Sequence, residues 1–116
     1  MEPEVLTLKS NMNRLKQLRY RSVNDIYVSS AIIDKAAYLL PTLDLQPYLS
    51  VTKEGNIGLE YGREDGSFLN FYIYDEPKIH MVVILVNAAG DRRHVRALVN
   101  PGEVNKKVKD FYSFEK

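Results

Sequence analysis

The spacing of apolar residues changes at Pro41, and this change constrains the fold more than any other feature of the sequence. Before Pro41, apolar residues recur every three or four positions, which is the period of a helix packed on one side. After it, apolar residues alternate with glycine or polar residues through 57–62, which is the period of a strand. The chain is therefore predicted to be an α+β protein, a single domain over residues 1–116, with helices first and a sheet after them.

Two helices are expected before Pro41. Apolar residues at helical spacing predict the first over about residues 5–19. Ser22, followed three residues later by Asp25, is a start signal for a second helical segment. Proline disfavours helical geometry at the residue before it, so Pro41 ends this segment. The apolar face of the second segment consists of Ile32, Ile33, Ala36, Leu39 and Leu40.

An antiparallel meander of four or five strands is expected after the helices, because short apolar stretches are separated by turn-forming residues. The expected strands are 47–52, 57–62, 68–74, 79–86 and 92–99. The stretch 79–86 is almost unbroken in its apolar character, which is typical of a strand covered on both faces. Asn100, Pro101 and Glu103 then form a helix-capping pattern, which predicts a closing helix.

The loop between the second and third strands decides which residues share a face of the sheet. A two-residue turn would set Leu59 opposite Tyr72, whereas a three-residue loop that ends in a left-handed Gly66 sets Leu59 opposite Phe71. We favour the longer loop because it gathers the aliphatic residues on one face. The other pairs that it predicts are Ile57 with Ile73, Tyr61 with Leu69, Gly58 with Tyr72 and Gly62 with Phe68. In the last two pairs, an aromatic ring is expected to cover a cross-strand glycine.

The opposite face of this sheet is expected to be rich in apolar side chains as well. Phe68, Tyr72 and Tyr74 lie on it in the favoured register. We expect the face to continue on the next strand through Ile79, Met81, Val83 and Leu85. Either the terminal helices cover these rings or a partner does, and exposed aromatic patches mark partner sites. The leading hypothesis is a non-catalytic protein-interaction module that binds a protein partner, or a second copy as a homodimer, through Phe68, Tyr72 and Tyr74.

Three stretches, 55–61, 65–71 and 104–112, carry a resemblance to known proteins. The first reads Gly-Asn-Ile-Gly-Leu-Glu-Tyr, and the last ends in Phe-Tyr. Together they resemble a group of small, uncharacterised bacterial proteins with a Gly-x-Ile-x-Leu-Glu-aromatic strand and a closing Phe-Tyr helix. The resemblance covers roughly residues 41–112, although members often have Trp at the position of Tyr61. It implies a companion of mobile-element, toxin-like or defence-related proteins, and it identifies no catalytic residue.

Little in the sequence indicates chemistry. There is no cysteine, which excludes a disulfide scaffold, a thiolate metal site and a cysteine nucleophile. His80 and His94 are expected on different strands, several residues apart along the ladder, and are interpreted as structural rather than metal ligands. Carboxylates cluster at 64–65 and 75–76, where they form turns. We therefore expect no enzyme activity, no metal and no cofactor.

Nucleic-acid binding is the alternative hypothesis. The formal net charge is +1, so the whole molecule has no strong field toward a polyanion. The basic residues are nevertheless concentrated in the first helix and in the fifth expected strand. The candidate phosphate contacts are Arg14, Lys16, Arg19, Arg92 and Arg96. Charged residues on a solvated helix or an edge strand are also ordinary, and at a sheet edge they prevent aggregation.

No run of about 18 apolar residues occurs, so no membrane contact is expected. Residues 1–4 lack the basic-then-apolar pattern of a signal peptide. A soluble, cytoplasmic protein is therefore expected.

Overall fold

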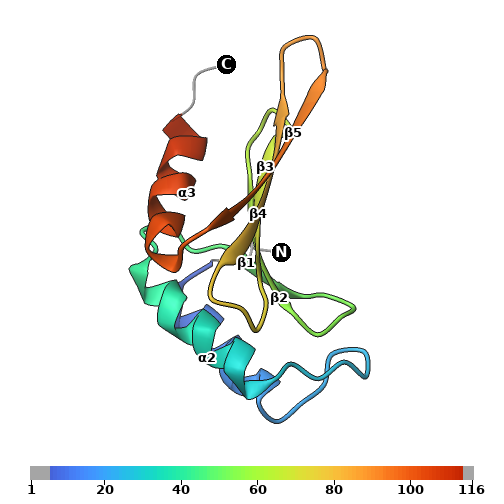
Figure 1. The fold of residues 1–116 in the computed structure, drawn as a ribbon, viewed down its shortest axis with the longest axis vertical. Helices are drawn as coiled ribbons and strands as arrows, with labels where there is room; N and C mark the ends of the chain where they lie inside the picture. The colour runs from blue at the N-terminus through green and yellow to red at the C-terminus, as the bar shows by residue number, and fades with distance from the viewer. Residues whose placement is uncertain (1–5, 114–116) are drawn as a thin grey trace, which may run out of the picture.

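The computed structural model describes residues 6–113 and has the α+β architecture expected from the sequence. A five-stranded antiparallel sheet carries the three helices of this range on one of its faces (Figure 1). The elements are α1 (Leu8–Leu18), α2 (Ser30–Leu39), β1 (Tyr48–Val51), β2 (Ile57–Gly62), β3 (Phe68–Ile73), β4 (Ile79–Val86), β5 (Arg92–Val99) and α3 (Val104–Ser113). Short 3-10 turns at Leu40–Thr42 and Pro101–Glu103 follow α2 and precede α3.

The sheet is a simple meander, with strand order β1-β2-β3-β4-β5. The bounds expected for β4 and β5 are confirmed, and β3 ends one residue earlier than expected, at Ile73. The register predicted for β2 and β3 is also confirmed, since Leu59 pairs with Phe71 and Gly58 with Tyr72. The strands β1 and β5 are the two edges, and β3 runs through the centre.

Three of the hairpins are closed by the same loop. In each, the third loop residue is a glycine in the left-handed region, and its amide donates to the carbonyl three residues earlier at 2.9–3.1 Å. These glycines are Gly55, Gly66 and Gly90, with φ values of 82°, 89° and 84°. The three-residue loop predicted at Gly66 is therefore confirmed. Because the loops between β1 and β2 and between β2 and β3 have the same length, the aliphatic residues of these three strands lie on one face of the sheet.

The first expected helix is present but shorter than predicted: α1 begins at Leu8 and ends at Leu18, so residues 6, 7 and 19 are not helical, and residue 5 lies outside the described residues. Thr7 caps α1 by accepting a hydrogen bond from the Ser10 amide at 3.0 Å. The start predicted for the second helix at Ser22 is wrong, because α2 begins at Ser30 with Ser29 as its cap. The chain turns at Asn24 and Asp25 instead, both with positive φ, so Asp25 is a turn residue rather than part of a capping box.

The core lies between the helices and the covered face of the sheet. The helices contribute Leu15, Ile33, Ala36, Leu39, Val104, Val108 and Phe111. The sheet contributes Leu49, Ile57, Leu59, Leu69, Phe71 and Ile73, all nearly inaccessible. The predicted cap at Asn100 and Glu103 is formed as a reciprocal capping box, which aims α3 back across the sheet. All three helices thus pack on the same face, and the opposite face is left without a covering element among residues 6–113 (Figure 1).

Candidate functional site

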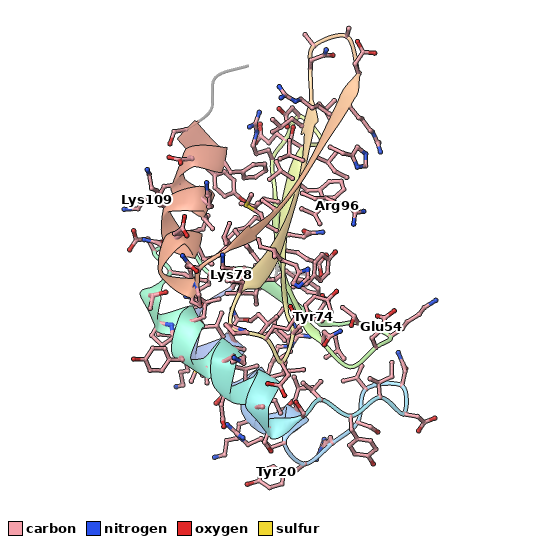
Figure 2. All side chains as sticks on the ribbon, viewed as in Figure 1. Tyr20, Glu54, Tyr74, Lys78, Arg96 and Lys109 are labelled. Atoms are coloured by element: carbon pink, nitrogen blue, oxygen red, sulfur yellow. The ribbon has the colours of Figure 1, made fainter. Side chains whose placement is uncertain are left out.

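The uncovered side of the sheet is the most distinctive surface of the described chain, and we call it the open face. Side chains alternate along each strand, so the residues paired with Gly58, Glu60 and Gly62 belong to it. Its members are Tyr48, Ser50, Gly58, Glu60, Gly62, Phe68, Asn70, Tyr72, His80, Val82, Ile84, Val86, Arg92, His94, Arg96 and Leu98. Tyr74 follows β3 directly, and Figure 2 shows Tyr74 and Arg96 on the side away from the helices.

The three residues predicted as partner-binding come together on this surface. Phe68, Tyr72 and Tyr74 are half-buried, and all three line one shallow depression of about 630 Å³. Tyr72 lies over Gly58, as predicted, because a Cβ atom built on Gly58 would be 3.5 Å from its ring. The same prediction for Phe68 and Gly62 is wrong, since nothing lies within 4 Å of such an atom on Gly62. The Phe68 ring therefore does not cover the strand next to it.

The continuation of this face on β4 also differs from the prediction. Ile79, Met81, Val83 and Leu85 lie on the helix side of the sheet, because Met81 pairs with Phe71 and Val83 with Leu69. The residues of β4 on the open face are instead His80, Val82, Ile84 and Val86. The run 79–86 is apolar at both parities, so its sequence does not indicate which set faces the helices. The open face is therefore less apolar than predicted, because it combines the aromatic rings, Val82, Ile84 and Val86 with polar residues such as Glu60, Asn70 and Arg96.

A small polar cluster lies at one end of the depression. His80 Nε2 is 2.9 Å from Glu76 Oε2, and the Tyr74 ring is tilted against the His80 ring with 4.3 Å between centroids. His80 pairs with Leu98 and His94 with Ile84, so the two histidines lie on different strands and several residues apart along the ladder, as expected. Among residues 6–113, no group of three or more His, Asp or Glu side chains could hold a metal ion. The cluster orients aromatic side chains, and no acid–base pair converges on a cavity here.

The basic residues predicted to contact nucleic acid do not form one site. Arg14 reaches the β1 edge, where its guanidinium lies 5.3 Å from the centre of the Tyr48 ring. Arg19 is paired with Asp34 on α2, and Lys16 is exposed on the same helix as both arginines. Arg92 and Arg96 lie on β5, at the opposite edge of the sheet. Four strand spacings, roughly 19 Å, separate these edges, so the two groups act on different surfaces.

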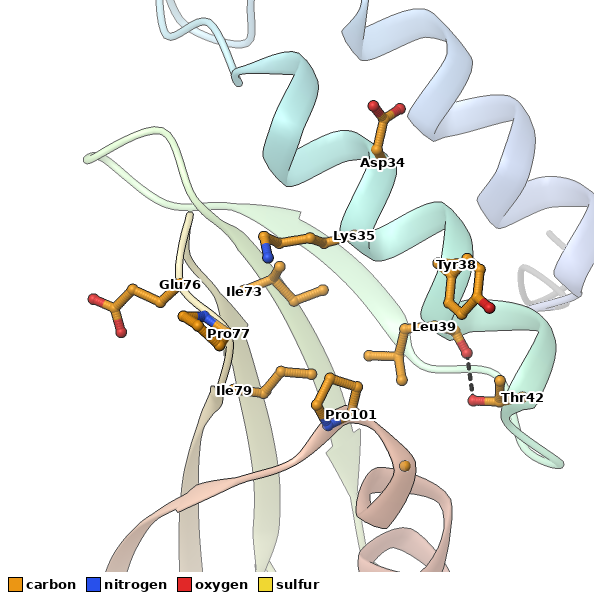
Figure 3. Close-up of a pocket in the computed structure, with 11 residues that line it drawn as sticks. Asp34, Lys35, Tyr38, Leu39, Thr42, Ile73, Glu76, Pro77, Ile79 and Pro101 are labelled. Atoms are coloured by element: carbon orange, nitrogen blue, oxygen red, sulfur yellow. Dashed lines mark hydrogen bonds between the residues drawn. The ribbon is translucent and has the colours of Figure 1, made fainter.

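A second concavity lies between α2, the β3–β4 loop and the start of α3 (Figure 3). Its volume is about 390 Å³, and its walls include Leu39, Ile73, Ile79, Pro77 and Pro101. The carboxylates at its rim are already engaged, Asp34 with Arg19 and Glu76 with His80. The sequence did not predict this pocket, because four separate segments build it.

Sequence reasoning also missed His80, Val82, Ile84 and Leu98 as parts of the open face. The alternation of Arg92, His94 and Arg96 could have indicated which residues of β4 face away from the helices, because β5 pairs with β4 through a short loop.

Comparison with protein-family models, with curated proteins and with solved structures finds no match to this chain. None of the helices described within residues 6–113 has the length and apolar character needed to cross a bilayer.

Proposed function

We propose that this chain is a non-catalytic protein-interaction module and that its open face binds another protein. The observation that carries the proposal is the position of Phe68, Tyr72 and Tyr74 on the sheet face that all three described helices leave uncovered. Tyrosine, phenylalanine and arginine are enriched in the centres of protein interfaces, whereas an ordinary surface rarely groups them over apolar neighbours.

The arrangement around these rings fits an interface. Val82 and Leu98 extend the apolar area across β4 and β5: Val82 is half-buried and Leu98 is 57% exposed, whereas Ile84 is buried. Asn70 Nδ2 lies 3.3 Å from the Tyr72 hydroxyl, so it holds the ring in place and leaves hydrogen-bonding capacity toward a partner. Aromatic side chains on a strand have few free torsions, so ordering them on binding costs little entropy. Charged residues at both edges supply the polar rim of such an interface.

The biological setting is proposed from the resemblance of residues 41–112 to small bacterial proteins. We propose a cytoplasmic bacterial or mobile-element protein whose partner is toxin-like or defence-related. A second copy of the chain is the other occupant of the open face, and it would make the protein a homodimer. Both occupants use the same side chains, so one set of variants tests them together.

A second candidate function is binding of single-stranded nucleic acid on the open face. The observation that favours it is that Arg92, His94 and Arg96 share this face with Phe68 and Tyr72. Bases stack on aromatic side chains while basic side chains follow the phosphates. Glu54 and Glu60 line the same surface and oppose a polyanion, so we rank this function below protein binding.

The proposal is tested with two matched variants. Tyr72→Asp places a charge in the centre of the open face, and Tyr38→Asp does the same on α2, where Tyr38 is 85% exposed. We expect wild type and Tyr38→Asp to capture the same protein from lysate of the encoding organism, or to show a dimer mass by light scattering, and Tyr72→Asp to lose this. A monomer whose captured proteins are the same for all three chains would contradict the proposal. Binding of an oligonucleotide that weakens steeply with salt would favour the second candidate.

A further inference from the structure

We infer that the free edge of β5 accepts an extended, acidic segment of the partner as a sixth strand of the sheet. This inference rests on the proposed function and adds how the partner is held and what its chemistry is. β5 is an edge strand of eight residues, and seven of them are exposed. No strand among residues 6–113 pairs with its outer side. Such an edge presents unpaired amide and carbonyl groups, which a strand from another chain can use.

The hairpin that joins β4 to β5 determines which backbone groups point outward. The Asn87 amide donates to the Asp91 carbonyl at 3.0 Å, so this pair is of the hydrogen-bonded type. In an antiparallel ladder such pairs alternate with pairs that do not bond to each other. Residues 93, 95, 97 and 99 therefore point their backbone groups toward β4. The outward amides and carbonyls belong to Arg92, His94, Arg96 and Leu98.

The side chains of these same four residues lie on the open face. An added strand thus meets Arg92, His94 and Arg96 at alternate positions on one face. None of the ion pairs in the described part of the chain involves them, so the guanidinium groups of Arg92 and Arg96 are available to a partner. Opposite charges facing each other across neighbouring strands stabilise a sheet. The complementary segment carries Asp or Glu at every second position.

The helix side of β5 determines which residues suit the remaining positions of the added strand. Val95 and Ala97 lie on the helix side of β5, and Val95 is 37% exposed. Apolar residues in the added strand would pack beside them. The preferred segment is therefore an alternation of acidic and β-branched apolar residues, which is also a good strand former.

A second copy of the chain fits this edge poorly. Antiparallel pairing of two β5 strands about His94 sets Arg92 of each copy opposite Arg96 of the other. Like charges directly opposite each other destabilise a sheet, so these arginines disfavour self-pairing and favour an acidic partner.

The test uses the full chain and a fluorescent peptide of sequence Glu-Val-Glu-Val-Glu-Val-Glu. We expect saturable binding by fluorescence anisotropy. Arg96→Gln is expected to weaken binding about fivefold, the worth of roughly 1 kcal/mol for one exposed pair. His94→Pro removes an outward amide without disturbing the ladder to β4, and it is expected to weaken binding as well. Arg93→Gln is the matched control, because it removes one charge from β5 on the helix side, and binding should stay within about twofold.

Hydrogen exchange gives a readout that charge attraction alone would not produce. On peptide binding, the amides of Arg92, His94, Arg96 and Leu98 should become protected, while the amides facing β4 should change little. A peptide N-methylated at every second residue keeps the charge and loses the amides, so it should not bind. The inference would be overturned if the N-methylated peptide bound as tightly as the unmethylated one. It would also be overturned if a single-stranded oligonucleotide bound more tightly than the acidic peptide and protected the same amides. No binding of the acidic peptide, while Tyr72→Asp still abolishes partner capture, would overturn the inference and leave the proposed function standing.

Discussion

The Tyr72 ring packs against the backbone of Gly58 on the neighbouring strand. A Cβ atom at Gly58 would lie 3.5 Å from Cε1 of this ring and 2.6 Å from the Ser50 hydroxyl oxygen. The absence of a side chain at Gly58 therefore leaves room for the Ser50 hydroxyl, while the edge of the Tyr72 ring lies over the same glycine. Because Tyr72 is central to the open face, this glycine supports the candidate site from below without itself contacting a partner.

Substituting Gly58 by alanine should destabilise the fold through a clash with Ser50. The added Cβ atom would lie 2.6 Å from the Ser50 hydroxyl oxygen, which must move, whereas its 3.5 Å separation from the Tyr72 ring is an ordinary van der Waals contact. Overpacking of this kind costs about 1–3 kcal/mol of unfolding free energy. The matched control is Gly62→Ala, because nothing lies within 4 Å of a Cβ atom there. It should change stability by less than about 0.5 kcal/mol in urea unfolding. Equal losses for both variants would show that backbone freedom, and not the approach to Ser50, explains the glycine at position 58.

Arg63 joins the β2–β3 hairpin to the end of α3. Its Nη1 donates to the Phe111 carbonyl at 3.0 Å, its Nη2 lies 2.5 Å from Asp65 Oδ2, and its guanidinium lies 5.2 Å from the Phe111 ring centre. Arg63→Ala should reduce the unfolding free energy by about 2 kcal/mol, because a nearly buried charged donor and its partners are lost together. Arg63→Lys should recover only a small part of this, since lysine lacks the planar fork.

The readout for Arg63 is specific to its position. Hydrogen exchange at the C-terminal turn of α3 should speed up in Arg63→Ala more than exchange in α1. Arg92→Ala, at an exposed site on β5, removes the same charge and should leave stability within about 0.5 kcal/mol. A stable Arg63→Ala protein with unchanged exchange in α3 would show that the contact contributes little.

Much of the fold followed from local patterns in the sequence. Turn residues bounded the apolar run of β4 and the following strand β5 to the residue, and the left-handed glycine at 66 determined the register of β2 and β3. Each of these signals depends on neighbours within a few positions, or on the simple rule that one face must be buried. The same reasoning placed Phe68, Tyr72 and Tyr74 on one surface.

The parts that failed depend on longer-range packing. Met81 and Val82 are both apolar, so polarity does not show which of them faces the helices. The length of the loop from Tyr74 to Lys78 does not show it either. Contacts with α3 decide it, since Met81 and Phe111 share the helix side. Likewise, both faces of the sheet are apolar, so the sequence left open which one the helices cover. Ser22 failed as a helix start because Asn24 and Asp25 adopt left-handed turn geometry.

Asp65 should make stability depend on pH in the acid range. The Ser67 backbone amide donates to its carboxylate at 2.9 Å, and this bond, aided by Arg63, lowers its pKa from 3.8 to about 2. A carboxyl whose pKa is lower in the folded state stabilises the fold above its unfolded pKa. The stabilisation is therefore complete above about pH 5 and is lost as pH falls through about 4 toward 2.

The variant Asp65→Asn should flatten the unfolding free energy between pH 2 and about pH 4, since asparagine can still accept from Ser67 but does not titrate. Asp75→Asn removes one exposed carboxylate at the next turn and controls for net charge. Unfolding in urea at several pH values measures the slope. An unchanged slope in Asp65→Asn would show that other carboxylates dominate the acid limb.

Asn11 is a fully buried polar side chain in α1. Its Nδ2 donates to the Pro47 carbonyl at 3.0 Å and to Gln46 Oε1 at 3.2 Å, which joins the first helix to the chain that enters β1. Asn11→Ala leaves both acceptors without this donor and should cost about 1–3 kcal/mol. Asn11→Asp should cost more at neutral pH, because a buried carboxylate would face two oxygen acceptors. Burial raises the pKa of such a carboxyl, so the Asp variant should lose stability as pH rises through that pKa and regain it in acid.

Asn13→Ala, exposed on the same helix, is the control and should stay within about 0.5 kcal/mol. If urea unfolding gives the same midpoint for Asn11→Asp at pH 4 and pH 8, the buried hydrogen bonds of Asn11 do not hold α1 on the sheet.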